Sequence, residues 1–309
     1  MADDPAVYEP PPGPPPLLTF EQIQHLAVQG WLAVDLPADF QQGLYDVSRA
    51  ASNFFDQSLN EKGAQYPSSR GTECGFYHVP DEKEYVTLRH HVHPESPMEG
   101  CARKVWSDAA HFLHRILCDL SRAGDYGVQV WDHLLDGSYD VPQDASDMSD
   151  ITTLMRLFRY YPTEGIASEH VDIGLLTLGV GDGHGLQMLD RSKSTLEWVD
   201  AEGPVVLIGD MARALLNDRV RAGLHRVVGN PSGRSSVVYA LRPNIRHPTD
   251  LATFGGEGVV DTREYFQRIK GRKYNVNARK DIRERQRQVQ RKHKEAEQKA
   301  QASQSPDFG

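Results

Sequence analysis

Cysteine is scarce in this sequence, whose 309 residues include only Cys74, Cys101 and Cys118. These three form no CxxC pair and no even-numbered set of the kind that cross-links small secreted domains. We therefore expect no structural disulfides, and the composition fits a reducing compartment.

Long apolar runs are equally absent. Apolar runs such as Val205 to Ile208 fall far short of the ~20 residues that span a bilayer. The N-terminus reads Met-Ala-Asp-Asp, without a basic leader or the apolar core of a signal peptide. We expect a soluble, cytoplasmic protein that has no membrane partner.

An excess of positive charge is also missing, because 34 Lys and Arg residues stand against 43 Asp and Glu residues, a formal net charge of −9. Proteins that follow nucleic-acid phosphates or bind anionic membranes usually carry positive surfaces. The composition thus argues against a nucleic-acid partner, and no motif indicates a protein partner.

Both ends of the chain have a biased composition. Residues 10–16 read PPPGPPP, which cannot donate helical hydrogen bonds and favours an extended form, so we expect a disordered head over 1–17. Residues 279–309 hold nine Lys or Arg and five Asp or Glu with almost no large apolar residues, which predicts a charged tail, helical or disordered.

Apolar residues recur at helical spacing in residues 18–150, which we expect to be mainly helical. Thr19 and Gln22 form a capping box, and Gly30 supplies a stop for this first short helix. Two longer runs follow, with apolar residues at Leu44, Val47, Ala51 and Phe54 and at Val105, Ala109, Phe112, Ile116 and Leu120. A closing helix is expected within 248–278.

Between residues 151 and 247 the period changes to two, and Gly, Asp and Asn separate short β-rich runs. The runs are Leu154 to Tyr161, Leu175 to Val180, Leu186 to Leu189, Val205 to Ile208, Leu224 to Val228 and Arg234 to Leu241. Many short strands without alternating helices indicate an antiparallel sandwich or barrel. The fold class is mainly β with flanking helices, α+β.

A possible metal site lies in two of these stretches. His170 and Asp172 are two residues apart, a spacing that puts both side chains on one side of a strand, and His225 follows in another strand. Two imidazoles and one carboxylate with open positions opposite suit a non-haem Fe(II) enzyme that activates oxygen. With 13 His and 43 acidic residues, a chance surface or core pair is the alternative.

A possible anion site follows on the next strand. Arg234 and Ser236 are again two apart, in an otherwise apolar strand. A buried guanidinium needs an anionic partner, and a planar fork beside a hydroxyl matches a carboxylate. The alternative is a salt bridge to an internal Asp or Glu.

Together these residues resemble the iron- and 2-oxoglutarate-dependent oxygenase superfamily, in particular its branch similar to isopenicillin N synthase. The resemblance runs through ordered motifs from residue 154 to 243 and beyond. They are Leu157-Phe-Arg-Tyr-Tyr-Pro162, His170-Val-Asp-Ile-Gly-Leu-Leu-Thr-Leu178, Gly185-Leu-Gln-Met188, Val205-Val-Leu-Ile-Gly-Asp210, Asn217-Asp-Arg219, Leu224-His-Arg-Val-Val228 and Arg234-Ser-Ser236.

This resemblance implies a double-stranded β-helix, or jelly roll, over 151–247. It implies that His170, Asp172 and His225 bind Fe(II), and that Arg234, Ser236 and Tyr161 contact the cosubstrate 2-oxoglutarate. Oxygen would then hydroxylate, desaturate or cyclise a small-molecule substrate, with release of succinate and carbon dioxide. Similar proteins imply a place in specialised, or secondary, metabolism.

Two other functions stay open at this point. One is an Fe(II) oxidase that, like isopenicillin N synthase, does without 2-oxoglutarate, because that relative also has an Arg and Ser pair. The other is a binding module that keeps the barrel without catalysis, which the intact triad disfavours.

Three further features allow more than one interpretation. Arg159 either faces inward to a substrate acid or forms an ion pair between strands. His90, His91 and His93, near Glu82 and Glu84, either form a second metal site, line the substrate entrance or lie on the surface. The glycine-rich stretch 179–185 lacks the spacing of a phosphate loop and is expected to be a hairpin turn containing His184.

Overall fold

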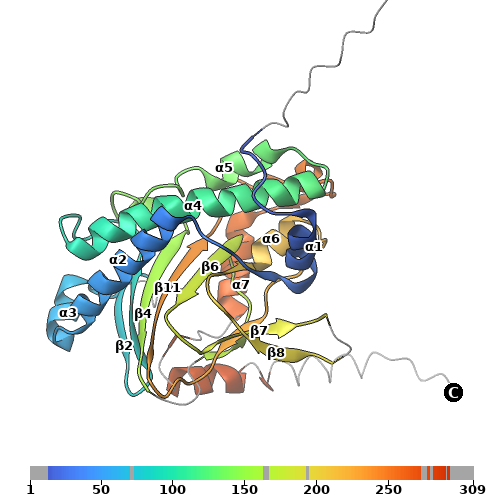
Figure 1. Cartoon of the computed structure of the whole chain (residues 1–309). Coiled ribbons are helices and arrows are strands. Elements are labelled where there is room, and N and C mark those ends of the chain that lie inside the picture. The colour runs from blue at the N-terminus through green and yellow to red at the C-terminus, as the bar shows by residue number, and fades with distance from the viewer. Residues whose placement is uncertain are drawn as a thin grey trace, which may run out of the picture.

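The computed structural model describes residues 13–69, 73–162, 167–192, 195–272, 277–278, 281–289 and 291–292. Two antiparallel sheets form its centre, and helices cover one face of the larger sheet (Figure 1). Residues of both sheets line one cavity between them, so the sheets face each other as in a sandwich.

The larger sheet has seven strands in the order β1-β9-β6-β11-β4-β3-β2. Its centre is the long strand β11, which pairs with β4 on one side and β6 on the other. The strands are β1 (Trp31–Ala33), β2 (Gly75–Val79), β3 (Lys83–Leu88), β4 (Leu154–Tyr160), β6 (Leu176–Gly181), β9 (Val205–Ile208) and β11 (Arg234–Leu241).

The smaller sheet has four strands in the order β5-β10-β7-β8. They are β5 (Ala167–His170), β7 (Leu186–Asp190), β8 (Glu197–Asp200) and β10 (His225–Val227). Because β6 belongs to the larger sheet and β7 to the smaller one, residues 182–185 carry the chain between sheets. The expected hairpin turn at 179–185 is therefore wrong.

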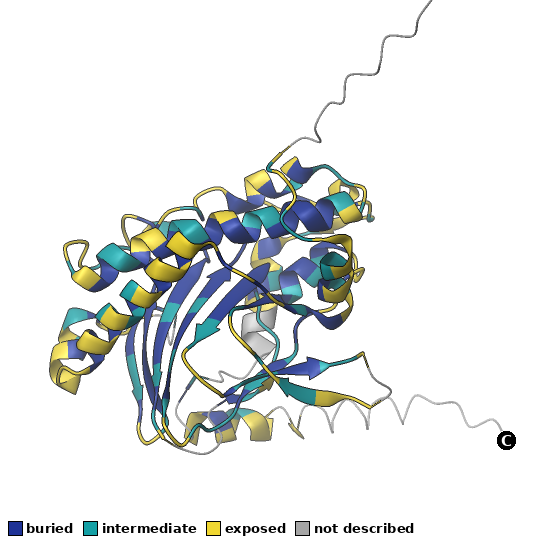
Figure 2. Ribbon diagram, viewed as in Figure 1, coloured by how far each residue is buried: buried dark blue, intermediate teal, exposed yellow. Residues whose placement is uncertain are grey.

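The helices of the first half are α1 (Phe20–Gln29), α2 (Ala38–Phe55), α3 (Leu59–Gln65) and α4 (Pro97–Ala123). Helices α2 and α4 pack on each other and on the larger sheet. Figure 2 shows the result: the strands beneath these helices are largely buried, and the exposed residues of the helices lie on their outer surface. Among the described residues, no helix combines the length and apolarity needed to cross a membrane.

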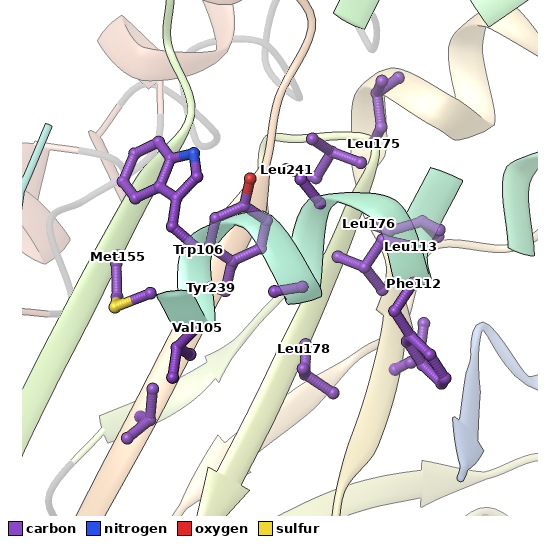
Figure 3. Packing of buried hydrophobic residues seen from close by; sticks show 14 of the residues in the cluster. Val105, Trp106, Phe112, Leu113, Met155, Leu175, Leu176, Leu178, Tyr239 and Leu241 are labelled. Atoms are coloured by element: carbon purple, nitrogen blue, oxygen red, sulfur yellow. The ribbon is translucent and has the colours of Figure 1, made fainter. Parts of the chain in front are cut away.

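The main core lies between α4 and the outer face of the larger sheet. Val105, Trp106 and Leu113 of α4 are fully buried, and Figure 3 shows them beside strand residues such as Tyr239 and Leu178. Trp106 donates its ring N–H to the carbonyl of Ser138 at 2.9 Å, which satisfies its polar atom inside the core. This core keeps the larger sheet rigid behind the cavity.

The remaining elements surround the two sheets. They are η1 (Val128–Trp131), α5 (Asp132–Leu135), η2 (Asp147–Ser149), α6 (Asp210–Leu215), β12 (Thr249–Asp250), η3 (Leu251–Phe254), β13 (Val259–Val260) and α7 (Thr262–Arg272). Helix α7 matches the closing helix expected within 248–278, and its Phe266 joins the core. Residues 281–289 form a further helix, one of the two forms expected for the tail.

The Pro-rich head differs from its prediction over its described part, residues 13–17. The carbonyls of Pro14 and Pro15 accept hydrogen bonds from Arg122 and Arg115 of α4, and the amide of Leu17 donates to Asp119 at 2.9 Å. An extended Pro-rich chain leaves its carbonyls available, and the basic face of α4 binds them. Residues 1–12 lie outside the described residues.

All six strand predictions are confirmed, within one residue at each end, by β4, β6, β7, β9, β10 and β11. Strands β1, β2, β3, β5, β8, β12 and β13 were missed. Strand β3 shows why. All six residues of its sequence, KEYVTL, are buried, so polar and apolar residues do not alternate along it.

We expect Leu113→Ala to lower the free energy of unfolding by about 3 kcal/mol, because it leaves a cavity between α4 and the larger sheet. Urea unfolding followed by circular dichroism measures the change. Leu196→Ala is the matched control, since its side chain is 66% exposed and its loss should cost less than about 0.5 kcal/mol. Equal losses in both variants would contradict this description of the core.

Candidate metal centre

His170, Asp172 and His225 meet in the structure. Each offers one ligand atom, and these atoms all lie within 4.8 Å of one another. His170 is the last residue of β5, and β10 pairs with β5 so that His225 lies directly opposite it. Asp172 follows the end of β5 rather than lying on the strand, and its oxygen is 4.0 Å from Nε2 of His170.

Both imidazoles are oriented by main-chain carbonyls. Nδ1 of His170 lies 2.8 Å from the carbonyl of Ser168, and Nδ1 of His225 lies 3.0 Å from the carbonyl of Gly223. A carbonyl can only accept, so each Nδ1 carries a proton, and in the neutral imidazole each Nε2 then presents a lone pair. This outer contact is typical of histidines that bind metals.

Asp172 is ionised in this setting. Burial by itself raises the pKa of this carboxyl, but the positive charge that His225 and His170 carry when they are protonated, with a smaller effect from Arg242, holds it at about 2. The group therefore offers a carboxylate oxygen at any pH near neutrality. Two neutral imidazole nitrogens and one carboxylate, all at one end of a cavity, form a donor set that suits Fe(II).

The cavity around these groups is about 80 Å³. Its other polar residues come from the larger sheet, where Arg234 and Ser236 lie on the inner face of β11. Apolar side chains complete the wall, including Phe158, Leu186, Leu207, Val227 and Val238. The cavity thus joins the three candidate ligands to the predicted Arg and Ser pair.

Arg234 has unused donors. Its Nε donates to the carbonyl of Gly183 at 3.1 Å, and its guanidinium lies 5.7 Å from the ring centre of Tyr160. Within the described part of the chain, its two terminal nitrogens have no hydrogen-bond acceptor. Burial lowers the pKa of Arg234, yet a guanidinium stays charged near neutrality, so it needs an anion.

The glycine-rich stretch makes room for this guanidinium. A Cβ on Gly181 would lie 2.0 Å from Nη2 of Arg234, and one on Gly185 would lie 3.2 Å from its Cδ. Gly185 also has φ of +143°, which disfavours other residues. The glycines therefore shape the Arg234 end of the cavity.

Tyr161 is not among the residues that line the cavity, and its expected contact with the cosubstrate stays a prediction. Its ring meets His78 edge-on, and burial and the Glu84 carboxylate raise the pKa of its phenol to about 12. Side chains alternate along a strand, so residues 157, 159 and 161 face the helices while 156, 158 and 160 face inward. Tyr160 takes the cavity position instead.

Arg159 forms an ion pair between strands, which is one of the two interpretations that the sequence allowed. It lies opposite Glu84 in the register of β3 and β4, with Nε 2.7 Å from the carboxylate, and it also pairs with Asp56 at 2.5 Å. Lys62 binds the other Glu84 oxygen at 2.5 Å. Arg159 therefore belongs to a buried network behind the sheet.

His91 and His93 also have structural partners. His91 lies 3.2 Å from the Glu99 carboxylate, and Nε2 of His93 lies 2.7 Å from the carbonyl of Gln65. The described residues contain no grouping of three metal-binding side chains besides the triad. The second metal site is thus wrong for the described residues. His184 is half exposed and pairs with Asp200 at 3.2 Å, as a surface residue would.

Sequence reasoning missed four polar residues that line the cavity: Tyr160, Arg156, Thr177 and Asn277. The first two were recoverable, because they alternate with Phe158 on the inner face of a predicted strand. Asn277 gave no signal, since it comes from the C-terminal stretch and reaches the site only by tertiary contact, where it accepts from Lys83 at 3.0 Å.

Comparisons with known proteins agree with this fold. No family model matches the chain. Over 120 residues it is 37% identical to the sexual differentiation process protein isp7 of Schizosaccharomyces pombe, and this match covers 36% of the chain but only 30% of that protein. The chain therefore matches under a third of the length of this relative.

Solved structures extend over more of the chain. A 2OG-Fe(II) oxygenase family protein of Caulobacter crescentus matches with a TM-score of 0.66 and 19% identity, covering 82% of this chain and 93% of that one. A full-length Neurospora crassa protein, solved in complex with alpha-KG and 5-formyluracil, matches with a TM-score of 0.63 and 19% identity, covering 81% and 88%. The chain has the fold of these oxygenases, and the predicted jelly-roll core is confirmed.

Replacing Arg159 tests its structural role. We expect Arg159→Leu to lower the free energy of unfolding by about 2 kcal/mol, less than the full loss of a buried pair because Lys62 still binds Glu84. Urea unfolding measures this, and the Fe(II) affinity of the folded variant should match that of the wild type. An unchanged free energy of unfolding together with a lower Fe(II) affinity would mean that Arg159 acts at the metal site.

Proposed function

We propose that this protein is an Fe(II)- and 2-oxoglutarate-dependent oxygenase that acts on a small organic molecule. The observation that carries the proposal is a single cavity lined by two histidines, an aspartate and an Arg and Ser pair. The fold supports it, because the Neurospora crassa protein that shares this fold was solved with alpha-KG, another name for 2-oxoglutarate.

His170, Asp172 and His225 would hold the iron. Their lone pairs converge, and the carbonyls of Ser168 and Gly223 fix the tautomer that directs each Nε2 toward the common point. Three protein ligands would leave coordination positions on the ion for a cosubstrate and oxygen.

Arg234 and Ser236 would hold the distal carboxylate of 2-oxoglutarate. The terminal nitrogens of Arg234 supply two parallel donors, and the Ser236 hydroxyl supplies a third from two residues along the same strand. Tyr160 packs over the guanidinium and keeps it in place. In this proposal the tyrosine at the 2-oxoglutarate site is Tyr160 instead of Tyr161.

When bound, the iron and 2-oxoglutarate supply oxygen activation, with release of succinate and carbon dioxide. The protein positions the substrate C–H bond and excludes water, and Phe158, Leu186, Leu207 and Val227 provide the apolar wall that does so. The outcome is hydroxylation, desaturation or ring closure. The resemblance of the motifs supports a substrate from specialised metabolism.

His225→Ala should abolish both metal binding and turnover. Without oxygen, the wild-type protein with Fe(II) and 2-oxoglutarate should develop a visible charge-transfer band, and with oxygen it should form succinate. His225→Ala removes one of three ligands, so both signals should vanish. His184→Ala is the matched control, because its exposed side chain lies outside the cavity lining.

Two results would contradict the proposal in different ways. A wild-type protein that binds Fe(II) and consumes oxygen with a substrate, but shows no band and no succinate, would be an oxidase that does without 2-oxoglutarate. A wild-type protein that binds no Fe(II) would be a non-catalytic binding module.

Gly181→Ala should weaken 2-oxoglutarate binding selectively. The added Cβ would lie 2.0 Å from Nη2 of Arg234, so the flexible guanidinium must move away from the cosubstrate. We expect the Kd for 2-oxoglutarate to rise by about tenfold, with unchanged Fe(II) affinity. Titration of the charge-transfer band measures it. Gly63→Ala, where a Cβ meets nothing within 4 Å, is the control, and an equal effect there would refute the role of Gly181.

A further inference from the structure

A buried hydroxyl in the wall of the cavity has no hydrogen-bond partner. Thr177 of β6 is 1% exposed, and its oxygen contacts neither donor nor acceptor within the described residues. Other buried side-chain atoms in the described part of the chain share this state, but of these only the Thr177 hydroxyl lines the cavity. Because an unpaired buried hydroxyl destabilises a folded chain, its presence here indicates an acceptor that completes the bond in the working protein.

The pairing of β6 turns this hydroxyl toward the cavity. Leu176 and Leu178 belong to the core beneath the helices, so Thr177 between them faces inward. Its neighbours across the strand pairs are Leu207 of β9 and Ala240 of β11, whose side chains carry no acceptor. The acceptor therefore comes from another residue of the cavity or from a bound group.

Asp172 is the nearest such residue along the chain. Residues 171–175 lead from β5 to β6, and Asp172 and Thr177 line the same cavity. The hydroxyl lies close enough to help to lower the pKa of Asp172, yet it completes no hydrogen bond with it. Since an ionised carboxylate can only accept, the Thr177 hydroxyl would be the donor in such a bond.

The main chain around Asp172 is held firmly. The amide of Asp210 donates to the carbonyl of Asp172 at 2.8 Å, and the amide of Gly209 donates to the carbonyl of Leu175 at 2.9 Å. The two segments lie so close that a Cβ on Gly209 would be 2.0 Å from the carbonyl oxygen of Gly174. These contacts fix the backbone of Asp172, while the orientation of its carboxylate depends on side chains.

The three candidate ligands differ in their outer contacts. Nδ1 of His170 and Nδ1 of His225 each meet a main-chain carbonyl, which orients the ring. Within the described residues, the Asp172 carboxylate accepts no corresponding hydrogen bond. A carboxylate that gives one oxygen to a metal keeps lone pairs on the other, and outer donors usually hold that second oxygen. Thr177 is placed to supply this donor.

We propose that Thr177 is a positioning residue of the metal centre, whose hydroxyl donates a hydrogen bond to the Asp172 oxygen that does not bind iron. This inference rests on the proposed function and deepens it. The bond would limit rotation of the carboxylate and direct its other oxygen toward His170 and His225. Because it is completed only in the iron-loaded protein, its benefit appears as metal affinity and not as stability of the metal-free chain.

Fe(II) affinity tests the hydroxyl directly. Thr177→Val removes it at nearly constant shape and should raise the Kd for Fe(II) about tenfold, whereas Thr177→Ser keeps it and should stay within about threefold of the wild type. Calorimetric titration of the metal-free protein with Fe(II), without oxygen, measures both.

Thr249→Val is the matched control for these titrations. Thr249 is also 1% exposed and has a buried hydroxyl without a partner in the described part of the chain, but it lies outside the cavity lining. Its replacement should leave the Fe(II) affinity unchanged.

Urea unfolding of the metal-free protein separates positioning from a structural role. Thr177→Val and Thr249→Val each remove a buried hydroxyl that has no partner, so both midpoints should equal or exceed that of the wild type. A hydroxyl that supports the fold would instead give Thr177→Val a lower midpoint. The proposal thus predicts weaker metal binding by a chain that is no less stable.

The possible failures are distinguishable. An unchanged Fe(II) Kd in Thr177→Val, a lower midpoint in that variant, or an equal loss of affinity in Thr177→Ser would each overturn the inference. A rise confined to the Kd for 2-oxoglutarate, titrated by the charge-transfer band, would assign the hydroxyl to the cosubstrate and also overturn it. A wild-type protein that binds no Fe(II) overturns the proposed function, and this inference falls with it.

Discussion

The pairing of β10 with β5 is the constraint on which the candidate site depends. It sets His225 directly opposite His170, and the two rings lie 4.2 Å apart between their centres. Side chains alternate along a strand, so a slip of one residue would turn His225 to the outer face and break up the triad. The pairing with β7 on the other side, which sets His225 opposite Met188, helps to fix this register.

Because side chains alternate along each strand, the two faces of the larger sheet have different roles: one packs against the helices and the other lines the cavity. On β4, Leu157 and Arg159 face the helices, where they join the core and the network around Glu84, and Arg156 and Tyr160 face the cavity. The side chains of the outer face are apolar or form ion pairs, so they hold the sheet against the helices. That rigidity lets the inner face keep buried charges such as Arg234, which cost stability when they lack an anion.

The sequence was sufficient to predict the strands that alternate cleanly and the three residues of the triad. His170, Asp172 and His225 were predictable from their place in ordered motifs, although Asp172 follows β5 instead of sharing a strand with His170. The face of β4 was not: the family resemblance gave Tyr161 the contact with the cosubstrate, and only the pairing with β3 shows which face meets the helices. Strand β3 escaped prediction because burial of all its residues, including Lys83 and Glu84, leaves no alternating pattern.

The role proposed for Thr177 could not be found from sequence either, since it depends on the residues that face it across the strand pairs. Our central proposal is simpler: two imidazoles and one carboxylate bind one iron. X-ray absorption at the iron edge of the Fe(II)-loaded protein, without oxygen, tests this directly. We predict a six-coordinate ion with scattering from two imidazole rings, and a spectrum without histidine ligands, or with one, would contradict it.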